Sequence, residues 1–239
     1  MAAGDFNSDG NLDLVTDSWG NNRLAILFGN SSHGFSTPVK YLEVGKHPYQ
    51  RVRAADLNKD GKLDLITTNL DGNNTTILLG DGKGNFKETP GSPFPCGDSP
   101  FGVAIGDIDQ DGNHDLAIIN SPTITSENKG RDGLTILMGC GDGKFKPMPG
   151  SPFATGTAPS RIAMGDLNGD GIADIAVANY KSGDISVFIM NKQGVTASYT
   201  VKTGISPDGI AIADLNGDNK ADIVVSNSGE HFIDIIFSR

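Results

Sequence analysis

The sequence has few of the residues on which disulfide frameworks, zinc sites and most catalytic motifs depend. Its 239 residues include two cysteines, one tryptophan and four histidines. The histidines (His33, His47, His114 and His231) occupy unrelated positions, and none belongs to an HExxH or GxSxG motif. We therefore expect no catalytic residues, no zinc site and no enzyme activity in this chain.

Long hydrophobic runs and runs of basic residues are also absent. No apolar stretch approaches the roughly 18–20 residues that a membrane-spanning helix needs. The first residues, MAAGDFNSDG, do not have the pattern of a signal peptide. The formal net charge of −10 opposes binding to a phosphate backbone. We expect neither a membrane span nor a nucleic-acid partner.

What the sequence does contain is one nine-residue loop, written five times. The copies are DFNSDGNLD, DLNKDGKLD, DIDQDGNHD, DLNGDGIAD and DLNGDNKAD. Each has Asp at the first, fifth and ninth positions and Asn or Asp at the third. The sixth position is Gly in four copies and Asn219 in the last. The loops hold 16 of the 29 acidic residues. Carboxylates crowd in this way at a cost unless a cation lies among them.

This pattern predicts one calcium site in each loop, or about five Ca²⁺ ions in the chain. Ca²⁺ binds carboxylate, amide and carbonyl oxygens at roughly 2.3–2.6 Å, and alternating donors let a tight loop surround one ion. The seventh residue would offer only its backbone carbonyl, so its side chain is free to vary. The predicted ligands of the five loops are, in order, Asp5, Asn7, Asp9, Asn11 and Asp13; Asp56, Asn58, Asp60, Lys62 and Asp64; Asp107, Asp109, Asp111, Asn113 and Asp115; Asp166, Asn168, Asp170, Ile172 and Asp174; Asp214, Asn216, Asp218, Lys220 and Asp222.

Two of the sites are expected to differ in affinity from the others. The third should bind most strongly because Asp109 adds a fourth carboxylate. The fifth should be the weakest, because Asn219 adopts a left-handed conformation less easily than glycine.

The loops begin like EF-hands but lack the Glu that an EF-hand has at its twelfth position. Short apolar runs flank them instead, such as GVAIGD before a loop and LAIIN after it. These runs favour strands, so each loop is expected to be the turn of a β-hairpin. Asp-Gly turns without a metal are the alternative. Five aligned copies with Asp at the ninth position favour calcium.

The spacing of the loops predicts the architecture. They start 51, 51, 59 and 48 residues apart, a period typical of a four-stranded propeller blade. The second strand of each unit ends in a polar residue, which is Ser18 in the first copy and then Asn69, Asn120, Asn179 and Asn227. A polar turn, a third apolar strand and a fourth strand follow. We predict an all-β fold: a β-propeller with five recognisable four-stranded blades, a calcium loop between strands 1 and 2 of each blade, and residues 1–239 as a single domain.

The same alignment argues against a disulfide. Cys96 falls in a connection that enters a first strand, and Cys140 falls in a turn that leaves a third strand. In an up-and-down sheet these connections lie at opposite ends, too far apart for disulfide geometry.

The segment GDLNGDGIADIAVAN, followed by ISVFIM, resembles the FG-GAP/VCBS-type repeat. That family includes the calcium-bearing blades of the integrin α-subunit propeller and many bacterial surface proteins. The resemblance covers essentially the whole chain and implies a β-propeller with the ligands given above. Phe-Gly precedes a loop only at Phe101–Gly102, and the Gly-Ala-Pro of integrin repeats is replaced by the asparagine segment. The bacterial branch is therefore nearer, and integrin-style ligand recognition is not implied.

The expected function follows from the calcium sites. Modules of this kind need free Ca²⁺ near 10⁻⁴–10⁻³ M, which is found outside cells. We therefore predict an extracellular or cell-surface location, with this chain as a portion of a longer exported protein. The predicted function is a calcium-binding, non-enzymatic propeller for adhesion or protein recognition. The alternatives are a carbohydrate-binding propeller and the propeller part of a polysaccharide-processing enzyme.

The predicted ligand, a protein or a glycan, is expected on the face opposite the calcium loops. The turns between second and third strands meet there. They carry the four asparagines, Trp19 and an enlarged loop at residues 122–131. Turns at one end of a rigid scaffold can vary without disturbing the core.

Overall fold

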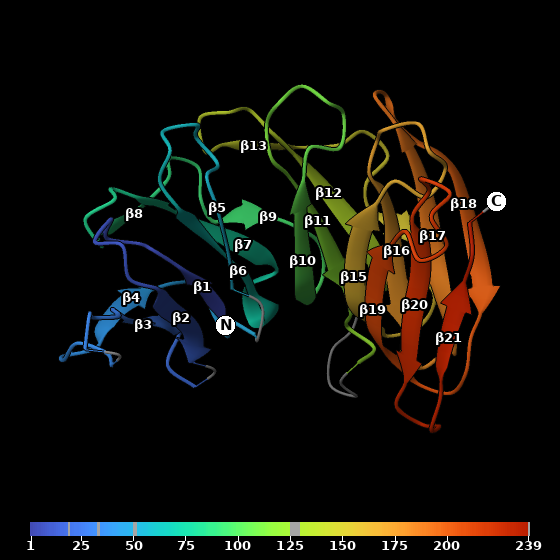
Figure 1. Cartoon of the computed structure of the whole chain (residues 1–239), viewed down its shortest axis with the longest axis horizontal. Helices are drawn as coiled ribbons and strands as arrows, with labels where there is room; N and C mark the ends of the chain where they lie inside the picture. The colour runs from blue at the N-terminus through green and yellow to red at the C-terminus, as the bar shows by residue number, and fades with distance from the viewer. Residues whose placement is uncertain (19, 33, 50–51, 125–129, 239) are drawn as a thin grey trace.

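A computed structural model describes residues 1–18, 20–32, 34–49, 52–124 and 130–238. Within them the chain forms five antiparallel sheets and one short 3₁₀ helix, η1 (Leu70–Gly72). Figure 1 shows the sheets following one another along an open arc, with the first and last sheets at its two ends. The predicted all-β fold and its five repeated sheets are confirmed, and the arrangement is β-propeller-like.

The sheets are built alike. The strands of the first are β1 (Ala2–Gly4), β2 (Asp13–Ser18), β3 (Arg23–Leu27) and β4 (Lys40–Glu43); of the second, β5 (Arg53–Ala55), β6 (Asp64–Asn69), β7 (Asn74–Gly80), β8 (Phe86–Glu88) and β9 (Phe94–Pro95); of the third, β10 (Pro100–Gly106), β11 (Asp115–Asn120), β12 (Gly133–Gly139), β13 (Phe145–Pro147) and β14 (Phe153–Ala154); of the fourth, β15 (Pro159–Gly165), β16 (Asp174–Asn179), β17 (Asp184–Asn191) and β18 (Gly194–Lys202); of the fifth, β19 (Pro207–Ala213), β20 (Asp222–Asn227) and β21 (Ile233–Ile236).

The number of strands differs from the predicted four in three of the sheets. The first and fourth sheets have four strands in sequence order. The second and third add a short fifth strand, β9 or β14, which pairs with the far end of the third strand. The fifth sheet has three strands within the described residues. The second-to-third-strand pairing that the repeat predicted is present in all five.

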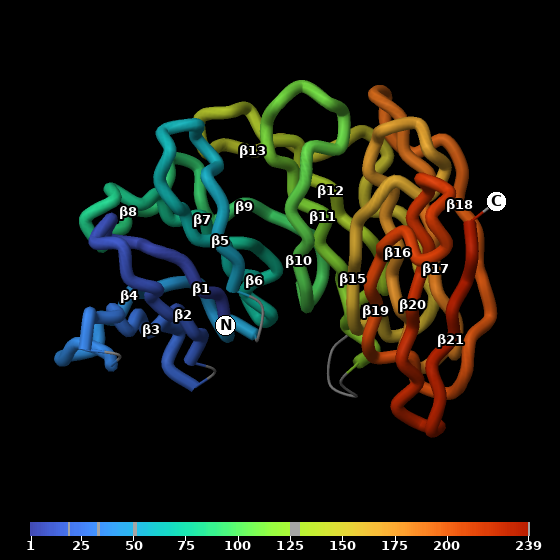
Figure 2. The backbone as a smooth tube through the Cα atoms, in the orientation of Figure 1, coloured from blue at the N-terminus to red at the C-terminus, as the bar shows by residue number. Residues whose placement is uncertain are grey.

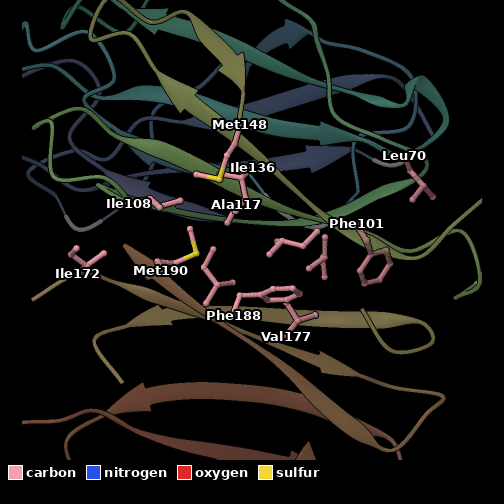
Figure 3. Packing of buried hydrophobic residues seen from close by; sticks show 13 residues of the cluster. Leu70, Phe101, Ile108, Ala117, Ile136, Met148, Ile172, Val177, Phe188 and Met190 are labelled. Atoms are coloured by element: carbon pink, nitrogen blue, oxygen red, sulfur yellow. The ribbon is translucent and has the colours of Figure 1, made fainter. Parts of the chain in front are cut away.

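Packing between sheets explains why the second strands are so apolar. In the three middle sheets, β6, β11 and β16 are buried along their whole length. Each lies at the centre of a sheet that has neighbours on both faces, so both faces of the strand are buried. Figure 3 shows this between the third and fourth sheets, where Ile136 and Met148 approach Phe188 and Met190. Four such clusters join each sheet to the next.

The first strands lie on the inner side of the arc. In Figure 2 the tube passes from the inner side of each sheet to its outer side before it moves to the next sheet. Contacts between neighbouring sheets are concentrated here, where β1 meets β5, β10 meets β15, and β15 meets β19. The two cysteines are free, with Cys96 buried and Cys140 exposed, which confirms that no disulfide joins them.

The four asparagines that were expected on a recognition face are buried instead. Asn69, Asn120, Asn179 and Asn227 are each at most 3% exposed. The Asn179 amide donates to Asp184 Oδ1 and to Ser186 Oγ, both at 2.9 Å.

Each asparagine also packs against a glycine in the connection from the preceding sheet. A Cβ at Gly156 would lie 2.6 Å from the Asn179 amide. The asparagines therefore join the second and third strands to the incoming chain, and the prediction that they bind a ligand was wrong.

Replacing one of these asparagines is expected to destabilise the fold. Asn179→Ala should lower the free energy of unfolding by about 1–3 kcal/mol, because it removes two hydrogen bonds to buried side chains and the amide that packs against Gly156. Denaturant unfolding would measure the change. The exposed Asn21, which donates to Ser18 Oγ, is the control. Asn21→Ala should change stability by less than about 0.5 kcal/mol. Equal effects of the two substitutions would contradict a bracing role.

Candidate functional site

The five acidic loops are the turns of β-hairpins, as predicted. In each, the ninth residue of the loop pairs with the residue immediately before its first Asp, as Asp64 does with Ala55 and Asp115 with Gly106. The sixth position has a positive φ in every loop, from 66° at Asn219 to 83° at Gly171. The fourth position is left-handed too, even where it is Ser8, Lys59 or Gln110. That second feature was not predicted.

Backbone amides inside each loop hold the acidic side chains in place. In the second loop, Asp56 accepts from the N–H groups of Asp60 at 3.2 Å and Gly61 at 2.8 Å. Asn58 Oδ1 accepts from the Asp60 N–H, and Asp60 Oδ1 accepts from the Lys62 N–H, at 3.1 and 3.0 Å. The first, third and fifth side chains of the first, third and fourth loops accept in the same way. In the fifth loop Asp214 accepts from the N–H groups of Gly217 and Asn219. Each carboxylate has about four lone-pair sites, so acceptor capacity remains for an ion.

The ninth residue has a different role from the other three. Asp64 is fully buried, and its two oxygens accept from two separate segments: the Leu57 N–H in its own loop and the Gly80 N–H at the end of β7, both at 2.8 Å. The ninth residues of the other loops make the same two bonds. This carboxylate ties the loop to the end of the third strand.

Burial also changes how readily these carboxylates ionise. Desolvation raises the pKa of Asp64 and of Asp115 to about 6. Two backbone N–H bonds to each carboxylate lower the pKa, and the nearby loop acids raise it. The same cause raises the pKa of Asp13 and Asp174. A cation beside these groups would favour the charged form and oppose the shift.

The third loop gathers carboxylates most closely. Asp107, Asp109 and Asp115 each offer an oxygen, and these oxygens all lie within 4.8 Å of one another. Three carboxylates of this kind suit a hard, oxygen-binding cation. Asp109 provides the fourth carboxylate on which the predicted strength of this loop rests.

The seventh side chain is less arbitrary than expected. The Asn11 and Asn113 amides donate to the fifth-position carboxylates Asp9 and Asp111 at 2.9 and 2.7 Å. Lys62 Nζ lies 3.4 Å from Asp60 Oδ2. In three loops this side chain therefore holds the fifth carboxylate, in addition to the backbone carbonyl that was expected to matter.

A glycine that closes the third strand was missed at the sequence level. A Cβ at Gly29, Gly80 or Gly139 would lie 2.2–2.3 Å from the carbonyl oxygen of the loop's eighth residue. In these three sheets the missing Cβ lets the strand end lie against the loop carbonyl while its N–H donates to the ninth Asp. The signal was the recurring Gly after LF, LL and LM in the third strands.

A second candidate site lies at the end of the sheets opposite the acidic loops. We call this end, where the second strands turn into the third, the turn face. Between the fourth and fifth sheets there is a pocket of about 530 Å³. Its lining includes Tyr180, Lys181, Ser182, Ser206 and Glu230.

Two of the lining side chains are fixed by hydrogen bonds. Glu230 accepts from the Ile205 N–H at 2.8 Å, and Lys181 donates to the Thr123 carbonyl. Trp19 and residues 125–129 of the enlarged loop lie outside the described residues.

Comparison with known families identifies the repeat. The model of the FG-GAP-like repeat matches residues 5–67, 56–118, 124–177 and 166–225. The chain belongs to the FG-GAP repeat family. The predicted resemblance is therefore confirmed across most of the sequence.

Individual relatives are distant. Integrin alpha pat-2 of Caenorhabditis briggsae is 26% identical over 244 residues, which cover 82% of this FG-GAP chain but 19% of the integrin. Among solved structures, a lectin of Agrocybe aegerita that recognises non-reducing terminal N-acetylglucosamine has a TM-score of 0.56 at 19% identity, over 97% of this chain and 64% of the lectin. A protein from Lactobacillus plantarum has a TM-score of 0.60 at 12% identity, over 95% and 68% of the two chains.

These structural likenesses show the fold alone, and this chain spans about a fifth of the integrin's length. Among the described residues there is no helix long and apolar enough to span a membrane.

The raised pKa values of Asp64 and Asp115 predict how stability depends on pH in the presence of a chelator. Their unfolded pKa is near 3.9, so between about pH 4 and 6 the folded state binds more protons than the unfolded state. The stability contributed by these two groups then falls as pH rises through that window.

The melting temperature in EDTA should therefore be higher at pH 5 than at pH 7.5. Thermal unfolding followed by circular dichroism would measure it. Carboxylates with lowered pKa values, such as Asp81 at about 2, titrate below pH 5 and do not contribute to the difference between pH 5 and pH 7.5. A higher melting temperature at pH 7.5 would contradict the assignment.

Proposed function

We propose that this FG-GAP chain is a calcium-stabilised, non-enzymatic recognition module that acts outside the cell and binds a protein or glycan through its turn face. The observation that carries the proposal is the separation of two kinds of site. The acidic loops occupy one end of the strands, and the polar pocket lies at the other end. One end is suited to holding ions and the other to contacting a partner.

Calcium at the loops is supported by the chemistry of the side chains. Oxygens from carboxylates and amides are the donors that Ca²⁺ prefers. Desolvation disfavours the charge of the buried ninth carboxylate, and a divalent cation would compensate for it. Calcium sites of this class are saturated at extracellular rather than cytosolic concentrations, which supports the proposed location.

Recognition at the turn face is supported by the pocket between the fourth and fifth sheets. Its volume lies within the range of about 300–1,000 Å³ that is common for ligand sites. Tyr180, 37% exposed, provides an aromatic surface, and Lys181 and Glu230 provide opposite charges beside it. Such a mixture can contact the side chains of a protein or the hydroxyl groups of a sugar.

A glycan ligand is a specific second candidate. An exposed aromatic ring beside hydroxyl and carboxylate groups is suited to stack on a sugar ring and to bond its hydroxyls. The lectin of Agrocybe aegerita has a similar fold and recognises a terminal sugar. Hydrolysis of a glycoside normally needs a pair of carboxylates. Glu230 is the one carboxylate among the lining residues of the pocket, which is why the proposed role is binding.

Chelation should destabilise the protein, because it leaves carboxylates uncompensated in each loop. Linkage gives about 2.7 kcal/mol of stability per site at a hundredfold excess of ion over Kd. The melting temperature in EDTA should therefore fall well below that in millimolar CaCl₂. An unchanged value would contradict calcium binding.

The loops should also differ in a fixed order. Asp107→Ala removes a ligand from the third loop and should cost more calcium affinity than Asp214→Ala in the fifth. Isothermal titration calorimetry of the two variants would compare them. The same loss in both would show that the fourth carboxylate has no effect.

Binding at the turn face can be tested with a glycan array that includes N-acetylglucosamine-terminated chains. If glycans bind, Tyr180→Ala should weaken binding roughly tenfold or more, since stacking on an aromatic ring is worth about 0.5–1.5 kcal/mol and the pocket shape is lost as well. Tyr41→Ala is the matched control, because Tyr41 is 59% exposed on β4 of the first sheet.

The calcium-dependent melting temperature should be unchanged in both tyrosine variants. If variants of the acidic loops abolish binding and Tyr180→Ala does not affect it, the ligand binds at the acidic loops, and the proposed turn-face site is contradicted. An array without any bound glycan would favour a protein ligand.

A further inference from the structure

The two faces of each sheet are used in a fixed way. In the second sheet, Ile66 on β6 and its partner Ile77 on β7 pack against the third sheet. Their sequence neighbours Leu65 and Leu78 also pair with each other, and they pack against the first sheet. We call the side of a sheet that meets the next sheet its forward face, and the side that meets the preceding sheet its backward face.

The same pairs recur at all four interfaces between sheets. The forward pairs are Val15 with Ile26, Ile66 with Ile77, Ala117 with Ile136, and Ala176 with Val187, and none of these residues is more than 6% exposed. The backward pairs packed against them are Leu65 with Leu78, Leu116 with Leu137, Ile175 with Phe188, and Ile223 with Ile236. Every interface therefore joins a forward face to a backward face.

The first sheet leaves its backward face uncovered. Its backward pair is Leu14 on β2 with Leu27 on β3, which is a leucine pair as in the second and third sheets. Both leucines are partly exposed, and so are Thr16 and Ala25 beside them. The residues that are buried in the neighbouring sheets are thus open to solvent here.

The fifth sheet leaves its forward face uncovered. Its forward pair is Val224 on β20 with Ile235 on β21, and Ile235 is 47% exposed. Ile233 on the same face is 57% exposed, and Ala211, which pairs with Val224, is exposed too. The outermost face of a repeat array is normally polar, because it meets water. Apolar faces that remain open in this way mark interaction surfaces.

We propose that these two end faces bind a second copy of this chain, with the forward face of the fifth sheet in one copy packed against the backward face of the first sheet in the other. The second copy is the expected occupant because it carries the complementary face, in the combination that forms all four interfaces within the chain. The two faces do not meet within one copy, since Figure 1 shows them at opposite ends of an open arc. Contacts between unlike faces are head-to-tail and either close a ring or extend the array.

Sedimentation equilibrium over a series of protein concentrations would test the proposal. Millimolar CaCl₂ and moderate salt reduce the repulsion between copies that each carry a net charge of −10. The average mass should rise above that of one chain as concentration increases. A mass of one chain at the highest soluble concentration would overturn the proposal and would leave the end faces to a different partner.

Two variants test whether the end faces are responsible. Ile235→Lys blocks the forward face, and Leu27→Lys blocks the backward face. Each should raise the dissociation constant roughly tenfold or more, because association would bury an ammonium group. Ile205→Lys is the matched control, since Ile205 is 60% exposed but lies at the turn face. It should associate as the unchanged protein does.

Mixing the two blocked variants tests the head-to-tail arrangement. The intact forward face of Leu27→Lys can still meet the intact backward face of Ile235→Lys, so the mixture should form pairs that contain one copy of each. Both variants gain the same charge, and therefore electrostatic attraction cannot produce this pairing. Unchanged melting temperatures would verify that both variants fold. The proposal is overturned if either variant alone associates as the unchanged protein does, or if the mixture does not pair.

Discussion

The structure of every sheet depends on one buried carboxylate, the ninth residue of the acidic loop. Its two oxygens accept hydrogen bonds from the loop and from the end of the third strand, 2.7–3.0 Å away. The loop, the second strand and the third strand therefore cannot move independently. Charge-assisted hydrogen bonds of this kind are about twice as strong as neutral ones, provided the carboxylate stays ionised. Desolvation opposes that ionisation, so a single residue links packing to whatever charge is held in the loop.

The repeat could be predicted from the sequence because its signals are local. Asp and Asn at alternating positions, a left-handed sixth residue and apolar runs on either side determine a hairpin without reference to the rest of the chain. The four asparagines could not be placed in the same way. A polar residue after a strand is usually an exposed turn residue, and only the packing of Gly156 against Asn179 shows why this one is buried. The turn-face pocket could not be predicted from the sequence either, because its lining residues Tyr180 and Glu230 come from different sheets.

The glycine at the end of the third strand recurs visibly in the sequence, but its structural role could not be predicted from the recurrence. The sequence repeats it at Gly29, Gly80 and Gly139, and the fourth and fifth sheets have Met190 and Ser238 at the same hydrogen-bonding position. Where glycine is present, the eighth loop carbonyl lies so close that no Cβ would fit. Where it is absent, the same N–H still reaches the ninth carboxylate. The hydrogen bond to the carboxylate is therefore the common feature, and the glycine is one way of reaching it.

Each sheet packs chiefly against its neighbours, through four separate apolar clusters. In such an array, stability is approximately a sum of contributions from single sheets and from the interfaces between neighbours. An ion bound in one loop would act on one sheet and would reach the next only through their shared cluster.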